Sequence, residues 1–282
     1  MKAPAMRPKI ALPVLIVILA ASVAGCVRNK TFVSQFESWA GSMTEKLAEA
    51  AAEDQPIILD VLGPVAVDVE SFNGDVTIIA DPKLEQAHLT FTRRATHGFQ
   101  RQEEAEASLP EIGYSAELVP GELGQVLRVR TSTTSTEPHY HRVDMLLELP
   151  EIDGVRVRTH NGGVVVTDVE GRVDIVTDDG PIRVASNHPM IRPVTIINNC
   201  GNIDYRVRTE STGAVDCQAL RGKVHHHAVY GRWIVHEGTD HDTLLATFNG
   251  GTNPIVLRAA DGNIRFSVVD DPTHMSPFNL FR

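Results

Sequence analysis

The sequence has few aromatic residues, few cysteines and no excess of positive charge. Aromatic residues make up 5% of its 282 residues, and only three residues are cysteine. Lysine and arginine number 26 against 36 aspartate and glutamate residues, so the formal net charge is −10. Without a basic face a protein releases few counterions from phosphates, and we therefore expect no nucleic-acid partner. Valine, isoleucine, threonine and glycine are plentiful instead, which favours β-structure.

The first 26 residues have the layout of an export signal. Three basic residues precede an apolar stretch at 10–21, which leads into Val23-Ala24-Gly25-Cys26. This stretch is shorter than the roughly 20 residues that span a bilayer, and small residues before Cys26 are typical of a cleavage site. The last four residues resemble the lipobox of bacterial lipoproteins, in which the cysteine thiol is acylated. The sequence therefore predicts removal of residues 1–25 and membrane attachment through Cys26.

Cleavage would also change the charge and the thiol content of the chain. Loss of Lys2, Arg7 and Lys9 takes the formal net charge from −10 to −13. Val27 follows the cysteine where an aspartate would indicate retention at the inner membrane. We therefore expect a lipid-anchored protein of the cell envelope, on the outer membrane if the cell has two membranes.

A unit of two short strands around a glycine recurs along the chain. Around Gly180, apolar residues stand seven and five positions before the glycine and two and four positions after it. The same frame surrounds Gly74, Gly162, Gly201 and Gly262, and Gly222 keeps most of it, with His226 in the last of the four positions. The steps from Gly180 to Gly201 and from Gly201 to Gly222 are both 21 residues, and the step from Gly162 to Gly180 is 18 residues. Gly250 is the centre of a weaker copy.

These units predict how the chain folds. Apolar and polar residues alternate, so the four apolar positions of a unit fall on one face of its two strands. Glycine at the joint supplies the positive φ that a tight corner needs. Stacked units of constant length bury their apolar faces together. We therefore expect an all-β, β-solenoid-like stack of two-strand coils, 18–21 residues apart. A sandwich of β-hairpins is the alternative, because Asn-Gly and Asp-Gly also form hairpin turns.

Two segments outside the repeat show helical patterns. Between residues 31 and 53, apolar residues recur at spacings of three and four, namely Phe32, Phe36, Trp39, Met43 and Leu47. This predicts an N-terminal helix that packs on an open end of the fold, serves as a spacer or partner helix, or lies on a lipid surface. Residues 98–108 predict one short inserted helix. At the other end of the chain, Phe278, Leu280 and Phe281 are expected to cover the last coil.

Four segments follow from these patterns. We expect the signal peptide at 1–25, a lipid-anchored helical spacer or cap at 26–56, an N-terminal β region with the inserted helix at 57–150, and the regular solenoid repeats at 151–282.

The succession of units resembles the bacterial "putative adhesin" family, a domain of unknown function. The resemblance rests on residues 67–78 with Asn73-Gly74, 147–150, 155–166, 171–180 and 260–264. Each motif alone is only a strand, a turn and a strand, so their order over about residues 57–270 carries the resemblance. It implies an extracytoplasmic β-solenoid-like domain, often on a membrane-tethered protein, with no reaction or functional residues attached to it.

A histidine-rich stretch interrupts the repeat at His225-His226-His227. In the repeat frame, His225 and His227 face outward and His226 faces inward. Two imidazoles at i and i+2 can bind a metal ion such as zinc if a third ligand arrives. An exposed polar strand with a buried, hydrogen-bonded His226 explains the same residues without a metal. We therefore predict no metal and no cofactor, and keep His225 and His227 as weak candidate ligands.

No pattern in the sequence predicts an enzyme. Asp178-Asp179 and Asp261 resemble acids that work in polysaccharide-cleaving β-helices, but turn formation explains them more simply. The sequence has neither a nucleophile elbow nor a phosphate-cradling glycine loop. Cys200 stands four residues beyond the coil position equivalent to Cys217, about 13 Å along a strand, which is too far for a disulfide.

We therefore expect a cell-envelope lipoprotein that displays a non-catalytic β-solenoid as a binding or structural module. Its partners would be the membrane, through the lipid, and a glycan or envelope protein. The alternatives are an envelope-stress or signalling accessory that binds a membrane partner, and a polysaccharide-active β-helix enzyme.

Overall fold

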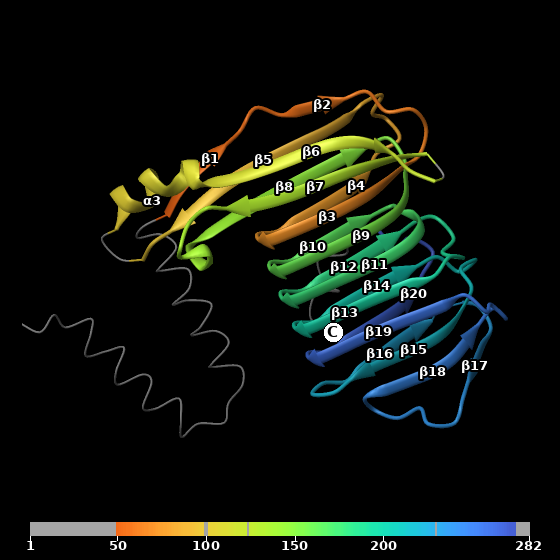
Figure 1. The fold of residues 1–282 in the computed structure, drawn as a ribbon. Helices are drawn as coiled ribbons and strands as arrows, with labels where there is room; N and C mark the ends of the chain where they lie inside the picture. The colour runs from red at the N-terminus through yellow and green to blue at the C-terminus, as the bar shows by residue number, and fades with distance from the viewer. Residues whose placement is uncertain (1–48, 99–100, 123, 229, 275–282) are drawn as a thin grey trace, which may run out of the picture.

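The computed structural model describes residues 49–98, 101–122, 124–228 and 230–274 (Figure 1). Cys26, the apolar pattern at 32–47 and the tail residues 278–281 lie outside the described residues. Within the described ranges, no helix has both the length and the apolar character needed to cross a membrane.

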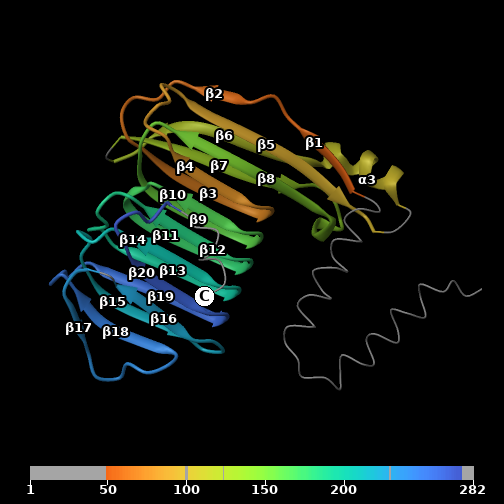
Figure 2. The same cartoon turned by 180° about the vertical axis from the view of Figure 1, so that it is seen from behind.

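Two ten-stranded sheets lie face to face with the core between them (Figures 1 and 2). Sheet A contains, in spatial order, β1 (Glu49–Glu53), β5 (Ala87–Thr96), β8 (His141–Leu149), β4 (Val76–Ala80), β10 (Val164–Thr167), β12 (Ile182–Ser186), β14 (Ile203–Val207), β20 (Ile264–Val268) and β16 (Val224–Ala228), with β2 (Ile57–Leu59) beside β5. Sheet B contains β17 (Trp233–Val235), β18 (Thr243–Phe248), β15 (Gly213–Ala219), β19 (Pro254–Asp261), β13 (Val194–Cys200), β11 (Glu170–Asp179), β9 (Ile152–Asn161), β3 (Val65–Asn73), β7 (Gln125–Thr133) and β6 (Ile112–Pro120). The helical elements are α3 (Gln102–Ser108), η1 (Leu109–Glu111) and η2 (Pro138–Tyr140).

Each coil consists of one strand of sheet B, a glycine corner and one strand of sheet A. The alternation of residue types produces this arrangement, because buried and half-exposed positions alternate along β3 and along β4. Neighbouring coils pair in parallel and in register, so Val157, Ile175 and Ile196 form one buried row across β9, β11 and β13. The expected all-β, β-solenoid-like fold with one short inserted helix is confirmed.

Corner glycines stack directly on one another. The Gly180 amide donates to the Cys200 carbonyl at 2.9 Å, and the Gly162 amide donates to the Asp179 carbonyl at the same distance. At Gly180, where φ is +121°, a Cβ atom would collide with the Gly162 carbonyl. Five of the six predicted corner glycines have a positive φ, and Gly222 does not. At that corner the absence of a side chain serves close approach alone, because a Cβ would collide with the Gly262 carbonyl.

Small polar side chains close the corners from inside. Thr159 and Thr177 each donate a hydroxyl hydrogen bond to the carbonyl two residues further on, at 3.3 and 3.2 Å. Asn198 donates to the Gly180 carbonyl at 2.8 Å and accepts from the Cys200 amide at 3.1 Å. These buried polar groups are themselves satisfied in this way, and they add hydrogen bonds to the backbone atoms of the corners.

The spatial order of the coils differs from the order expected from equal spacing. The coil of Gly262 lies between the coils of Gly201 and Gly222, because β19 pairs with both β13 and β15. Residues 233–248 form the hairpin β17–β18, in which β18 runs antiparallel to β15. The hairpin pairs with one edge of β15 through β18. The next strand, β19, therefore pairs with the other edge of β15 and lies between β15 and β13. The similar apolar frames of the coils allow the exchange.

Two further expectations are wrong. Residues 49–53 do not continue a helix but form β1, which pairs antiparallel with β5 and buries Ala50. Tertiary pairing overrides the helical preference of an alanine-rich segment here. Gly250 does not form the corner of a coil, because the strand before it is β18, whose buried residues Leu244, Ala246 and Phe248 alternate in the opposite phase.

Candidate functional site

The predicted histidine cluster lies on β16, the edge strand of sheet A. His225, His226 and His227 are all exposed. The expectation that His226 is buried is wrong, because no strand closes sheet A beyond β16 in the described part of the chain. The His226 ring instead lies 6.1 Å from the Trp233 ring. Both cysteines of the repeat are free thiols: Cys217 is buried on β15 and Cys200 is exposed on β13.

Within the described ranges, one trio of metal-ligating side chains converges, and His225 and His227 are not part of it. The trio is Asp240, His241 and Asp242, in a loop. Asp240 accepts backbone hydrogen bonds from Asp242 and Thr243 at 3.0 and 2.9 Å, so its carboxylate serves to form the turn.

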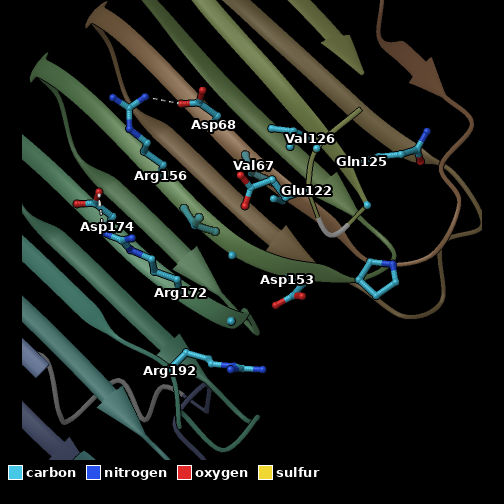
Figure 3. Close-up of a pocket in the computed structure, with 17 residues that line it drawn as sticks. Val67, Asp68, Glu122, Gln125, Val126, Asp153, Arg156, Arg172, Asp174 and Arg192 are labelled. Atoms are coloured by element: carbon cyan, nitrogen blue, oxygen red, sulfur yellow. Dashed lines mark hydrogen bonds and ion pairs between the residues drawn. The ribbon is translucent and has the colours of Figure 1, made fainter. Parts of the chain in front are cut away.

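A groove of about 680 Å³ opens on the outer face of sheet B (Figure 3). It runs across the first residues of β3, β7, β9 and β11, and the β6–β7 loop and Arg192 complete its walls. Small or apolar residues contribute to its lining, among them Pro64, Ala66 and Val126.

Irregular pairing produces the groove. The register between β9 and β11 shifts between Glu170 and Val173. Gly154 and Gly171 take positive φ values of 101° and 78° at this irregularity. A Cβ atom at Gly171 would collide with the Asp153 side chain, so the two bends fit closely into each other. Such β-bulges redirect side chains at the start of a strand, and here they separate Asp153 and Arg172 from the regular rows.

Along one side of the groove and beyond it, the charged rows of sheet B neutralise one another. Arg130 and Arg156 both bind Asp68, at 2.8 and 2.9 Å, and Arg156 also binds Glu70 at 2.9 Å. Burial alone would raise the pKa of Asp68, but the hydrogen bonds from the two arginines outweigh burial and hold that pKa below its ordinary value. Arg158 binds Asp174 at 2.8 Å.

Four charged groups in the groove lack such close partners. Arg172 is 68% exposed and lies 3.8 Å from Asp174, a carboxylate that Arg158 already occupies. The side chains of Arg192, Asp153 and Glu122 form no ion pair or hydrogen bond with any residue that the structure describes. The groove therefore offers free guanidinium and carboxylate groups above a small, partly apolar surface, and this combination suits binding of a charged ligand.

The sequence analysis missed this groove. One feature of the sequence does indicate it. Gly154 and Gly171 fall outside the corner frame and interrupt the alternation of apolar and polar residues at the starts of β9 and β11. Nothing in the sequence alone indicated that the two interruptions lie side by side.

Comparison with known proteins supports the fold and the family. Residues 139–267 match the Toastrack DUF4097 family. The chain is similar to the crystal structure of a putative cell adhesion protein from Clostridium sporogenes, with a TM-score of 0.56 and 10% identity over 78% of this chain and 100% of that chain. A putative adhesin from Bacteroides fragilis aligns over 78% of this chain and 97% of its own, at 10% identity and a TM-score of 0.27. At this identity the first likeness shows the fold alone, and the second is too distant to support an argument. No curated protein matches the chain. Over residues 139–267, slightly less than half of its length, the chain is similar to the Toastrack DUF4097 family, which agrees with the resemblance of its coils to an adhesin-like group of unknown function.

Proposed function

We propose that this protein is a non-catalytic binding module of the cell envelope, held at a membrane by acylated Cys26 and contacting its ligand through the groove on sheet B. The observation that carries the proposal is the set of free charges in the groove. Across the neighbouring rows of sheet B, guanidinium and carboxylate groups pair at 2.8–2.9 Å. A folded surface gains little from leaving charges unpaired, whereas a bound ligand gains strongly from them.

The chemistry of the lining supports binding rather than catalysis. The described side chains that line the groove include no serine, cysteine, histidine or tyrosine. The carboxylates of Asp68 and Asp174 are engaged by arginines, which leaves them poorly suited to accept a proton from a substrate. The ligand we favour is a component of the envelope, presented close to the membrane that carries the anchor.

Membrane attachment is tested by replacing the acylated residue. We expect the natural chain in the membrane fraction, with the mass of a lipidated Cys26. Cys26→Ser should remain soluble or keep its signal peptide, because serine has no thiol to accept the lipid. Membrane retention of Cys26→Ser by a cleaved chain would contradict the anchor.

Binding through the groove is tested by filling it. Ala66→Trp places a large ring in the groove lining, and Thr77→Trp places the same ring on the outward face of β4, in the other strand of the same coil. We expect the full chain to bind isolated envelope fragments, Ala66→Trp to lose most of this binding and Thr77→Trp to retain it. Equal binding by the two variants would refute the groove as the contact site.

A further inference from the structure

The kind of free charge in the groove restricts the ligand. Arg172 and Arg192 lie beside each other on neighbouring segments, because the Val173 amide donates to the Pro193 carbonyl at 3.1 Å and Val173 pairs in register with Val194. Both side chains line the groove, and guanidinium N–H donors suit the oxygens of a phosphate or a carboxylate.

Carboxylates face the same space. Figure 3 shows Asp153 and Glu122 on the side of the groove toward the β6–β7 loop, whereas Arg172 and Arg192 follow one another along its other side. Asp153 is held at the end of the bulge, where Gly171 leaves room for it. Free carboxylates accept hydrogen bonds from an ammonium group and favour its charge.

These opposite charges decide between ligand classes. A simple anion drawn to the two arginines would also meet the repulsion of Asp153 and Glu122, in a chain whose formal net charge is −10. A simple cation drawn to Asp153 and Glu122 would be repelled by Arg172 and Arg192. A ligand that carries both charges gains from both sides, as complementary potentials across an interface do. The lining residues Pro64, Ala66 and Val126 can accommodate the short carbon chain that joins the two charges.

We infer that the groove recognises a zwitterionic group, with its phosphate or carboxylate held by Arg172 and Arg192 and its ammonium held by Asp153 and Glu122. The inference rests on the proposed binding function and names the chemistry of its ligand. A soluble metabolite and a phospholipid headgroup both offer this pair of charges.

Calorimetric titration of the full chain in detergent tests the inference, with phosphoethanolamine as the zwitterionic probe and inorganic phosphate and ethanolamine as its one-charge parts. Phosphoethanolamine should bind at least about ten-fold more tightly than either part, the size of effect that one charged hydrogen bond produces. Arg172→Gln with Arg192→Gln should lower its affinity by about ten-fold or more. The double variant Glu122→Gln with Asp153→Asn should bind phosphoethanolamine no more tightly than inorganic phosphate.

The matched control is Arg221→Gln, which removes an exposed arginine at a distant corner that pairs with Asp261 at 3.4 Å; its affinity should equal that of the natural chain. Vesicles of phosphatidylethanolamine and of phosphatidylglycerol distinguish the two sources. If the chain prefers phosphatidylethanolamine vesicles and the double arginine variant loses this preference, the ligand is a lipid headgroup. If the chain binds phosphoethanolamine but neither kind of vesicle, the ligand is a soluble molecule.

Two results would overturn the inference. One is phosphate bound as tightly as phosphoethanolamine with no effect of the carboxylate variants, which would make the groove a plain anion site. The other is no binding of any probe while Ala66→Trp still reduces binding to envelope fragments. In that case the proposed function stands and the zwitterionic ligand is wrong. Loss of the Ala66→Trp effect would instead remove the proposed function itself.

Discussion

The imidazole rings of His97 and His141 lie 5.7 Å apart in the interior, where β5 ends and β8 begins. His97 is 7% exposed and His141 is fully buried. The Ser108 hydroxyl donates to the Ala105 carbonyl and lies 2.9 Å from His97 Nε2, and the Thr133 hydroxyl lies 2.8 Å from His141 Nδ1. His97 Nδ1 and His141 Nε2 have no hydrogen-bond partner in the described structure. A proton added to His141 would therefore create a buried charge whose Nε2–H has no hydrogen-bond acceptor in the described structure.

This pair predicts loss of stability in mild acid. Burial lowers the pKa of His141 from its ordinary value, repulsion by His97 lowers it further, and Glu111 opposes both. Because the folded pKa lies below the unfolded one, the unfolded chain takes up the proton first. The stabilisation is complete above about pH 6.5 and is lost as the pH falls from there toward the folded pKa. Melting temperatures between pH 7.5 and 5 should fall in the natural chain.

His141→Gln provides the test of this assignment, because glutamine keeps a partner for Thr133 and cannot be protonated. The melting temperature of this variant should change less between pH 7.5 and 5 than that of the natural chain. His225→Gln, at an exposed position on β16, is the control and should keep the natural slope. The same slope in all three chains would show that other groups cause the acid loss.

A second prediction concerns the stacked corners. Gly180→Ala forces a Cβ against the Gly162 carbonyl at a φ of +121°, so we expect a loss of about 3 kcal/mol or more in unfolding free energy. Gly63→Ala is the matched control, because its φ is +70° and nothing lies within 4 Å of the added atom. Gly63→Ala should lower the unfolding free energy by only about 1–2 kcal/mol, the intrinsic cost of a left-handed backbone conformation for a residue with a Cβ. Urea denaturation measures both, and equal losses would contradict the stacked corner.

The sequence predicted the coil itself but not the order of coils. Alternation and corner glycines are local, so the frame around Gly180 specifies its two strands directly. The choice of neighbour is not local, since Leu257 and Cys217 both offer an apolar side chain to pair beside Ile196. The equal spacing of the glycines predicted that Cys217 pairs beside Ile196. In the structure Leu257 takes that place, and β15 lies between β19 and β18.

The groove and β1 were not predicted from the sequence, because both depend on contacts between segments that are far apart in the chain. Gly154 and Gly171 are visible as interruptions, but their contact depends on the register of two strands. Glu49–Glu53 has the composition of a helix, and only pairing with β5, together with the ion pair from Arg94 to Glu49 at 2.6 Å, makes it a strand. Long-range contacts decide such segments.

A third prediction tests the coil order directly. Cys200 pairs in register with Asp261 on the adjacent strand, and Arg221 lies one coil further away. Asp261→Cys should therefore cross-link to Cys200 with a short thiol reagent, and Arg221→Cys should not. Under the sequential order of coils the result would be the reverse. Mass spectrometry of peptides from the folded chain distinguishes the two, and Cys217 stays unmodified because it is buried.

A fourth prediction concerns the end of the stack beyond β16. Trp233 of β17 lies 4.9 Å from the Phe248 ring and 5.4 Å from the Phe266 ring, so it covers the last buried aromatics of the core. Trp233→Ala should lower the unfolding free energy by about 2–4 kcal/mol, through lost burial and the cavity that remains. Ile234→Ala is the control, because the neighbouring side chain is 43% exposed; it should cost less than about 1 kcal/mol. Trp233→Phe should recover most of the loss, since the indole N–H has no hydrogen-bond partner in the described structure. If phenylalanine recovers nothing, then the ring contacts are not the source of the stability, and the hairpin would have to close the stack through its backbone pairing with β18 alone.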